Sequence, residues 1–169
     1  MRKMIFLGIA IIAAHAGDFA HGQQEKLKIY LRQTGHAGEL RSEVVAVKNN
    51  CELVRAWHVG AYPGSGTAAL VVCGSRSYGR HGEFDFADIV REKGWLKTPP
   101  PLDEYFKLLD YAEFEAVVMR MEHLQKSELR IRNGELVLTF MRGFMPNGRR
   151  STRVIVGETG KVRISGAEI

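Results

Sequence analysis

The dipeptide Asn133-Gly134 constrains the fold most, because it lies between two segments in which apolar and polar residues alternate. Such a dipeptide favours a two-residue turn with positive φ at both positions, which joins antiparallel strands. That turn fixes three cross-strand pairs: Arg132 with Glu135, Ile131 with Leu136, and Leu129 with Leu138. One face of the hairpin is then apolar and the other polar, and a one-residue slip would exchange them.

A second hairpin is predicted at the end of the chain, around Gly160. A three-residue loop with this glycine in the left-handed conformation sets Val156 against Val162 and Val154 against Ile164. The two hairpins, joined through residues 145–148, give a four-stranded meander. Its buried face requires a covering layer, which the preceding helical segments would supply.

The two cysteines, Cys51 and Cys73, belong to a third predicted hairpin, with its turn at residues 63–66. When Cys51 faces Cys73, the other facing pairs are Leu53 with Val71, Arg55 with Ala69, and Trp57 with Thr67. Directly opposed residues are close enough for a bridge, so we expect a disulfide. The alternatives are two inert thiols, or a cysteine nucleophile with His58 as its base.

The rest of the chain divides into shorter elements. Strands are predicted over 26–32 and 42–49, a loop over 74–82, and helices over 85–93 and from Asp103 to Ala112. Residues 113–124 fit both helical and alternating spacing, and we favour a helix. The fold class is therefore α+β: mostly antiparallel sheet, with a C-terminal four-stranded meander, a bridged N-terminal hairpin and two helices between them.

The N-terminus has the pattern of a secretory signal peptide. Arg2 and Lys3 precede an apolar run from Met4 to Ala14, and Ala14-His15-Ala16 places small residues where a signal peptidase reads them. The signal is thus predicted over 1–16, with a cut possible as late as residue 22, before a single exported domain over 17–169. The run is shorter than the roughly 20 residues that a membrane span needs. We expect a periplasmic or secreted protein without a stable membrane anchor after cleavage.

Charge is distributed unevenly. The net charge of +5 becomes +3 without residues 1–16, which is modest for nucleic-acid binding, so no nucleic-acid partner is expected. Residues 83–122 carry a net −5 and residues 126–163 a net +6. An acidic helical layer beside a basic sheet is the simplest explanation. The spacing of His, Cys and acidic residues matches no standard metal motif, and neither a metal nor a cofactor is predicted.

The outward face of the meander carries the candidate binding residues, Arg130, Arg132, Arg153 and Arg163. Arginine offers a planar donor fork that suits carboxylates and phosphates. The face could therefore dock an acidic protein or an anionic ligand. The plainer interpretation is a charged sheet face that only keeps the protein soluble.

Three functions remain open. The leading hypothesis is a small exported, non-catalytic binding protein that recognises another protein or an anionic ligand through these arginines. The second is a hydrolase-like enzyme with acid–base chemistry around His81, Asp85 and Asp88, which lie in or just after the predicted loop. The third is a structural protein of the envelope without a discrete ligand.

Overall fold

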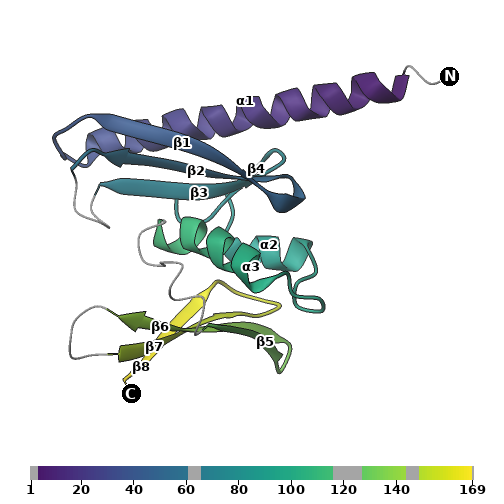
Figure 1. Cartoon of the computed structure of the whole chain (residues 1–169), viewed down its shortest axis with the longest axis vertical. Helices are drawn as coiled ribbons and strands as arrows, with labels where there is room; N and C mark the ends of the chain where they lie inside the picture. The colour runs from purple at the N-terminus through teal and green to yellow at the C-terminus, as the bar shows by residue number, and fades with distance from the viewer. Residues whose placement is uncertain (1–3, 61–65, 116–126, 144–148, 169) are drawn as a thin grey trace.

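Two antiparallel four-stranded sheets alternate with helices in layers (Figure 1). A computed structural model describes residues 4–60, 66–115, 127–143 and 149–168. The first sheet has the order β1-β2-β3-β4 and the second β5-β6-β7-β8. The strands are β1 (Leu40–Val47), β2 (Cys51–His58), β3 (Thr67–Cys73), β4 (Arg76–Tyr78), β5 (Glu128–Arg132), β6 (Glu135–Gly143), β7 (Arg149–Val156) and β8 (Arg163–Glu168). The helices are α1 (Met4–Gln33), α2 (Phe86–Glu92) and α3 (Leu102–Leu109). The predicted α+β class is confirmed.

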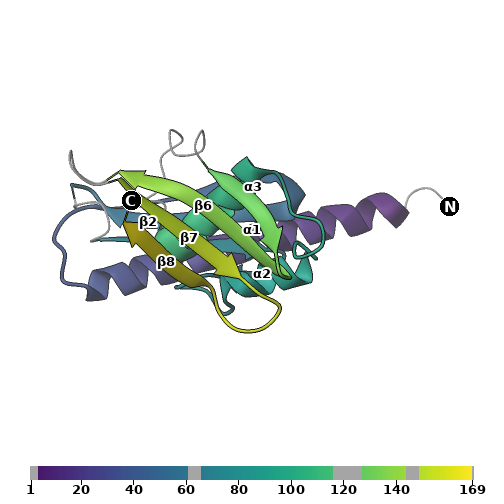
Figure 2. The same ribbon diagram turned by 90° about the horizontal axis from the view of Figure 1, so that it is seen from below.

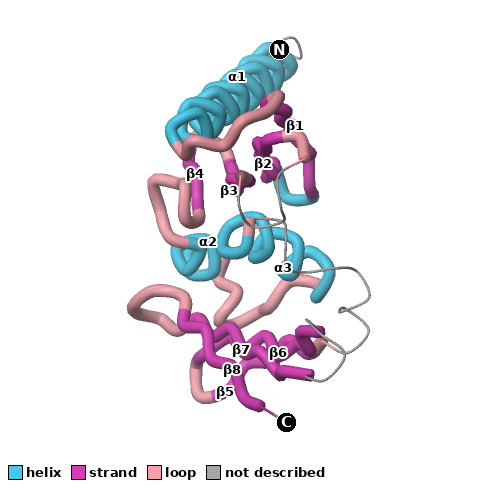
Figure 3. The backbone as a smooth tube through the Cα atoms, turned by 90° about the vertical axis from the view of Figure 1, so that its left-hand side faces the viewer, coloured by secondary structure: helices cyan, strands magenta, loops and turns pink. Residues whose placement is uncertain are grey.

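The layers follow one another as α1, the first sheet, the pair α2 and α3, and the second sheet (Figure 3). One apolar cluster runs through the lower three layers. It joins Leu53 and Val71 of the first sheet to Tyr105 and Phe106 of α3, and these to Phe140 of the second sheet. A smaller cluster, between α1 and the other face of the first sheet, contains Leu27, Leu31, Val54 and Leu70 among others. The first sheet is therefore covered on both faces, and the second sheet on one.

The bridged hairpin has the predicted register. Cys51 lies opposite Cys73, and the other three predicted pairs also hold. The two sulfur atoms are 2.03 Å apart, so the cysteines form a disulfide. The hypothesis of a cysteine nucleophile is therefore wrong. The ring of His58 instead approaches two backbone carbonyl oxygens, that of Leu31 at 3.2 Å and that of Gly38 at 3.4 Å. The predicted turn at 63–66 lies almost wholly outside the described residues.

The C-terminal meander is also confirmed, with its Asn133-Gly134 turn and the pairing of Val154 with Ile164. The predicted three-residue loop is wrong, because the β7–β8 ladder ends one pair earlier and Val156 does not pair with Val162. Both turn residues have positive φ, 52° and 76°. The central strands bury their inner face as predicted, with Leu136, Leu138, Phe140, Val154 and Val156 all at 0% exposure. The edges differ from expectation, because Ile131 and Ile164 remain 39% and 49% exposed. The linker 144–148 lies outside the described residues.

Residues 26–32 form the end of α1, so the strand predicted there is wrong. Leu27, Ile29 and Leu31 alternate like a strand, but only Leu27 and Leu31 are buried, while Ile29 is 51% exposed. A spacing of four places the two leucines on one helical face, which packs on the first sheet. Beyond that sheet, the N-terminal turns of α1 project past its edge (Figures 1 and 2). In the described part of the chain, no helix combines the length and apolarity needed to span a bilayer.

The connecting elements agree with prediction in part. Asp85 caps α2, and Gly94, with φ 67°, follows its end. The predicted loop 74–82 is wrong over Arg76–Tyr78, which form the edge strand β4. The Tyr78 hydroxyl donates to Glu92 of α2 at 2.8 Å.

After α3, residues Asp110–Phe114 form a π-helical turn and Glu115 is left-handed, with φ 63°. The helix favoured over 113–124 therefore does not continue α3 past Phe114, and residues 116–126 lie outside the described part.

Candidate functional site

The register of the second sheet places the four candidate arginines on its outer face. Arg130 lies opposite Val137, Val137 opposite Ile155, and Ile155 opposite Arg163, so these four residues form one row across the sheet. Thr139 pairs with Arg153 in a neighbouring row, and Arg132 pairs with Glu135. Since the inner face carries Leu136, Leu138 and Val154 against the helices, the arginine-bearing face points away from the rest of the molecule.

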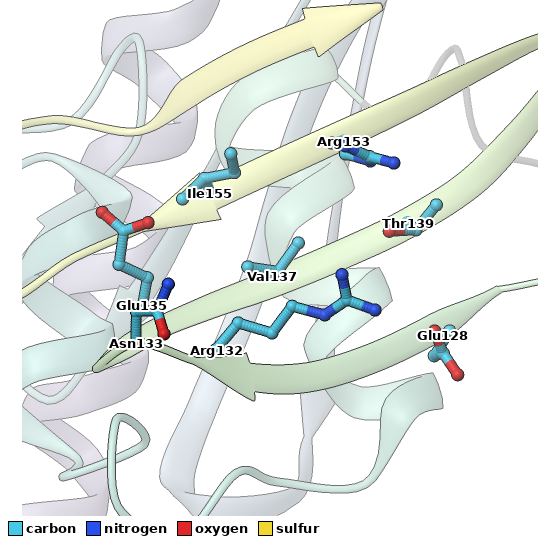
Figure 4. Close-up of a pocket in the computed structure, with 8 residues that line it drawn as sticks. All are labelled: Glu128, Arg132, Asn133, Glu135, Val137, Thr139, Arg153 and Ile155. Atoms are coloured by element: carbon cyan, nitrogen blue, oxygen red, sulfur yellow. The ribbon is translucent and has the colours of Figure 1, made fainter. Parts of the chain in front are cut away.

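A hollow of about 310 Å³ opens on this outer face (Figure 4). Strands β5, β6 and β7 and the β5–β6 turn form it. Its lining residues are Glu128, Arg132, Asn133, Glu135, Val137, Thr139, Arg153 and Ile155. Two of the four predicted arginines therefore line the hollow, and the other two, Arg130 and Arg163, flank its central row.

The carboxylates of the hollow already have cationic partners. Glu128 forms an ion pair with Arg130, and Glu135 forms one with Arg163. Arg132 and Arg153 are exposed, and no carboxylate within the described ranges pairs with either. The four arginines thus divide into two that are neutralised on the sheet and two that still have open donor groups.

The hollow has a cationic end and an apolar middle. In Figure 4 the Arg132 side chain extends along the sheet past Val137, so that its guanidinium group lies on the Thr139 side of that residue. Arg153 is directly opposite Thr139, so both guanidinium groups lie at the same end of the hollow. Val137 and Ile155, a directly opposed and partly exposed pair, form the middle. Two guanidinium groups beside a hydroxyl provide several donors for one oxyanion.

The residues of the enzyme hypothesis have structural partners. His81 Nε2 lies 3.0 Å from Oε1 of Glu115, and its ring packs on Tyr30 of α1 with centroids 4.7 Å apart. Asp85 and Asp88 form a capping box at the start of α2, in which the Asp85 backbone N–H donates to Asp88 at 3.0 Å. His81 therefore pairs with Glu115, and the two aspartates complete a helix cap.

Sequence reasoning missed two acidic residues near this cap, Glu113 and Glu115. Burial raises the pKa of Glu113 to about 7, and the negative charge of Asp85 adds to the rise. Arg80, Lys161 and a hydrogen bond from the Phe86 backbone act in the opposite direction. Both glutamates belong to the ambiguous segment 113–124, and no sequence pattern connects them with His81 or Asp85, some 30 residues earlier.

Two contacts join the acidic helices to the basic sheet. Lys161, in the β7–β8 loop, lies 3.9 Å from Asp85, and Arg91 of α2 donates to the backbone oxygen of Gly160 at 3.0 Å. These contacts fix the tip of the hairpin on α2. They do not involve the outer-face arginines. The partners of Arg130 and Arg163 are Glu128 and Glu135, which belong to the sheet itself.

Within the described part of the chain, no group of three or more His, Cys, Asp or Glu residues is arranged to hold a metal ion. Comparison with protein-family models, with curated proteins and with solved structures finds no match to this chain.

Proposed function

We propose that this protein is an exported, non-catalytic binding module that recognises an anionic group through Arg132 and Arg153. The observation that carries the proposal is the division of charge on the outer face. Both carboxylates of the hollow pair with Arg130 and Arg163, which leaves Arg132 and Arg153 without a carboxylate partner among the described residues.

The surroundings of these two arginines favour an anion over simple solvation. Glu128 and Glu135 are held by neighbouring cations, so they compete less for the guanidinium groups of the hollow. Thr139 lies between the two arginines and adds a hydroxyl donor. An arginine fork donates two parallel hydrogen bonds to a carboxylate or phosphate. A charge-assisted bond of this type is about twice as strong as a neutral one.

Two observations support export. The charged start, the apolar run to Ala14 and the small residues at 14 and 16 follow the order of a secretory signal. The Cys51–Cys73 disulfide is typical of an oxidising compartment such as the periplasm or the extracellular space.

The test is a calorimetric titration with inorganic phosphate at low and at high ionic strength. We expect binding that weakens as salt rises, and Arg132→Gln or Arg153→Gln to weaken it at least about tenfold at low salt. Lys161→Gln is the control, because it removes the same charge from the β7–β8 loop, and neither Lys161 nor its partner Asp85 lines the hollow.

Equal losses in K161Q and R153Q would show that only the overall field of the protein attracts the anion, and would contradict the assigned site. Absence of phosphate binding by the wild-type protein would reject the proposed function and favour a structural role.

A further inference from the structure

The hollow is larger than the anion that its cationic end would hold. A phosphate or carboxylate group fills less than half of about 310 Å³, since an atom the size of a water molecule takes about 30 Å³ in the liquid. The total is at the lower end of the range found for small-molecule pockets, roughly 300–1,000 Å³. The remaining space lies over the middle of the sheet face, next to the arginines.

That remaining space has an apolar floor. Val137 and Ile155 face each other on adjacent central strands, and Arg130 and Arg163 flank them in the same row. The heads of these two arginines are held by Glu128 and Glu135. A compact apolar group placed on this floor would cover the Val137 and Ile155 side chains, which are otherwise partly exposed to water.

The residues that line the far end of the hollow offer no free cation to a second negative charge. Asn133 and Glu135 lie there, on the side of Val137 away from the two guanidinium groups (Figure 4). Because Glu135 already pairs with Arg163, a ligand with an anionic group at each end would leave its second charge without a partner. Specificity often depends on such an unpaired charge as well as on the attractive contact.

We propose that the ligand is a small amphiphilic anion, with a phosphate or carboxylate head on Arg132 and Arg153 and a neutral apolar body on Val137 and Ile155. This inference depends on the proposed function, since it adds a body to the anionic group assigned there. It defines the ligand as a small molecule with one charged end.

The experiment compares three phosphates by calorimetry on the full chain: inorganic phosphate, phenyl phosphate and 4-carboxyphenyl phosphate. We expect phenyl phosphate to bind at least about tenfold more tightly than inorganic phosphate, because its ring covers apolar surface. The carboxylated analogue should lose most of this advantage, since its second charge lies beside Glu135, which already pairs with Arg163, and finds no free cation there. Benzoate in parallel distinguishes a carboxylate head from a phosphate head.

Two variants locate the apolar contact. Val137→Thr and Ile155→Thr keep the β-branched shape that suits a strand but place a hydroxyl group in the floor. Each should reduce the preference for phenyl phosphate over inorganic phosphate severalfold. Val45→Thr is the control, because Val45 is an exposed strand valine of the first sheet, 42% exposed and remote from the hollow.

The outcomes separate the two proposals. Equal affinities for phosphate and phenyl phosphate, both lost in R153Q, would overturn the amphiphilic ligand but keep the anion site. No binding of any of these anions would overturn both. A preference for phenyl phosphate that survives in V137T and I155T would place the apolar contact elsewhere and also reject this inference. Should I155T not fold, V137T alone decides.

Discussion

Glu113 has an environment unlike that of an ordinary surface carboxylate. It belongs to the π-helical turn after α3, and burial together with the charge of Asp85 raises its pKa to about 7 from 4.5. Arg80 and Lys161 reduce the rise without cancelling it. The folded protein therefore holds this proton more tightly than the unfolded chain does. The contribution to stability is complete below about pH 4.5 and is lost as pH rises to about 7.

Glu113→Gln should remove this pH dependence, because the amide imitates the protonated acid and still accepts from the Phe86 backbone. At pH 8 we expect the variant to be about 1–2 kcal/mol more stable than the wild type, a figure reduced because the carboxyl group is partly exposed. Near pH 4 the two should agree. Urea unfolding from pH 4 to 8 measures the difference. Glu83→Gln, an exposed carboxylate in the same region, is the control and should leave the pH profile unchanged. Lower stability of E113Q at pH 8 would contradict the prediction.

Gly79 explains at the same scale why residues 74–82 are not the solvated loop that their composition suggested. A Cβ atom at Gly79 would lie 2.4 Å from the backbone oxygen of Ala112, and the next residue, Arg80, donates its backbone N–H to that same oxygen at 2.9 Å. Glycine and charged residues do indicate a turn. Here, however, the glycine permits close contact between two backbones, which depends on an element more than 30 residues away.

At the scale of elements, hairpins were predictable to the residue, while α1 was not. The Asn133-Gly134 turn and the Cys51–Cys73 pair each fix a register locally, and the alternation of apolar residues leaves only one face to bury. In residues 26–32 the same alternation was misleading, because Leu27 and Leu31 pack on the first sheet as part of a helix while Ile29 is exposed. Short segments with both periodicities are decided by tertiary packing.

The packing of α1 also distinguishes the two predicted cleavage sites. Ala20 is fully buried and Phe19 is partly buried against the first sheet, next to Val44 and Val54. A chain that begins at Gln23 lacks both, and should be about 2 kcal/mol less stable than one that begins at Gly17. Urea unfolding of the two mature forms measures this. On the proposal of export, we expect N-terminal sequencing of the mature chain to find Gly17. Equal unfolding midpoints for the two forms would refute the argument from packing.

On the scale of the whole molecule, the sequence predicted two groups of strands but not how they are joined. The predicted helices lie between the sheets and share one apolar cluster with both. Phe140 of the second sheet contacts Phe106 of α3 and Phe114 of the π-helical turn, with ring centroids 5.9 and 6.4 Å apart. The two sheets should therefore unfold in a single transition.

Phe140→Ala tests this coupling. The loss of a fully buried ring should cost about 3–5 kcal/mol. In a Trp95→Phe background, Trp57 fluorescence reports on the first sheet alone, and far-UV circular dichroism reports on the whole chain. Both midpoints should decrease together. Ile131→Ala, at an exposed edge of the second sheet, should change them little. A Trp57 transition unaffected by F140A would mean that the sheets unfold independently.

The candidate site could be predicted from the sequence only in outline. Alternation placed all four arginines on one face. Arg130 and Arg132 precede the turn in the same phase, and Arg153 lies on the same face of the second hairpin as Arg163, which is opposite Ile155. Which of these arginines pair with carboxylates could not be predicted from the sequence. Glu135 reaches Arg163 from a strand that is not its neighbour in the sheet, and side-chain contacts of this kind depend on the twist and packing of the strands.

The layer order decides through which end the protein can be attached to a surface. Helix α1 forms one outer layer and the second sheet, with the hollow on its free face, forms the opposite one (Figure 3). A tether at the N-terminus therefore leaves the hollow turned towards solution, whereas β8 brings the C-terminal end of the chain to the sheet that carries the hollow. On a sensor chip, or on any surface in a cell, attachment through the first residues is compatible with ligand capture, and attachment through the last residues competes with it.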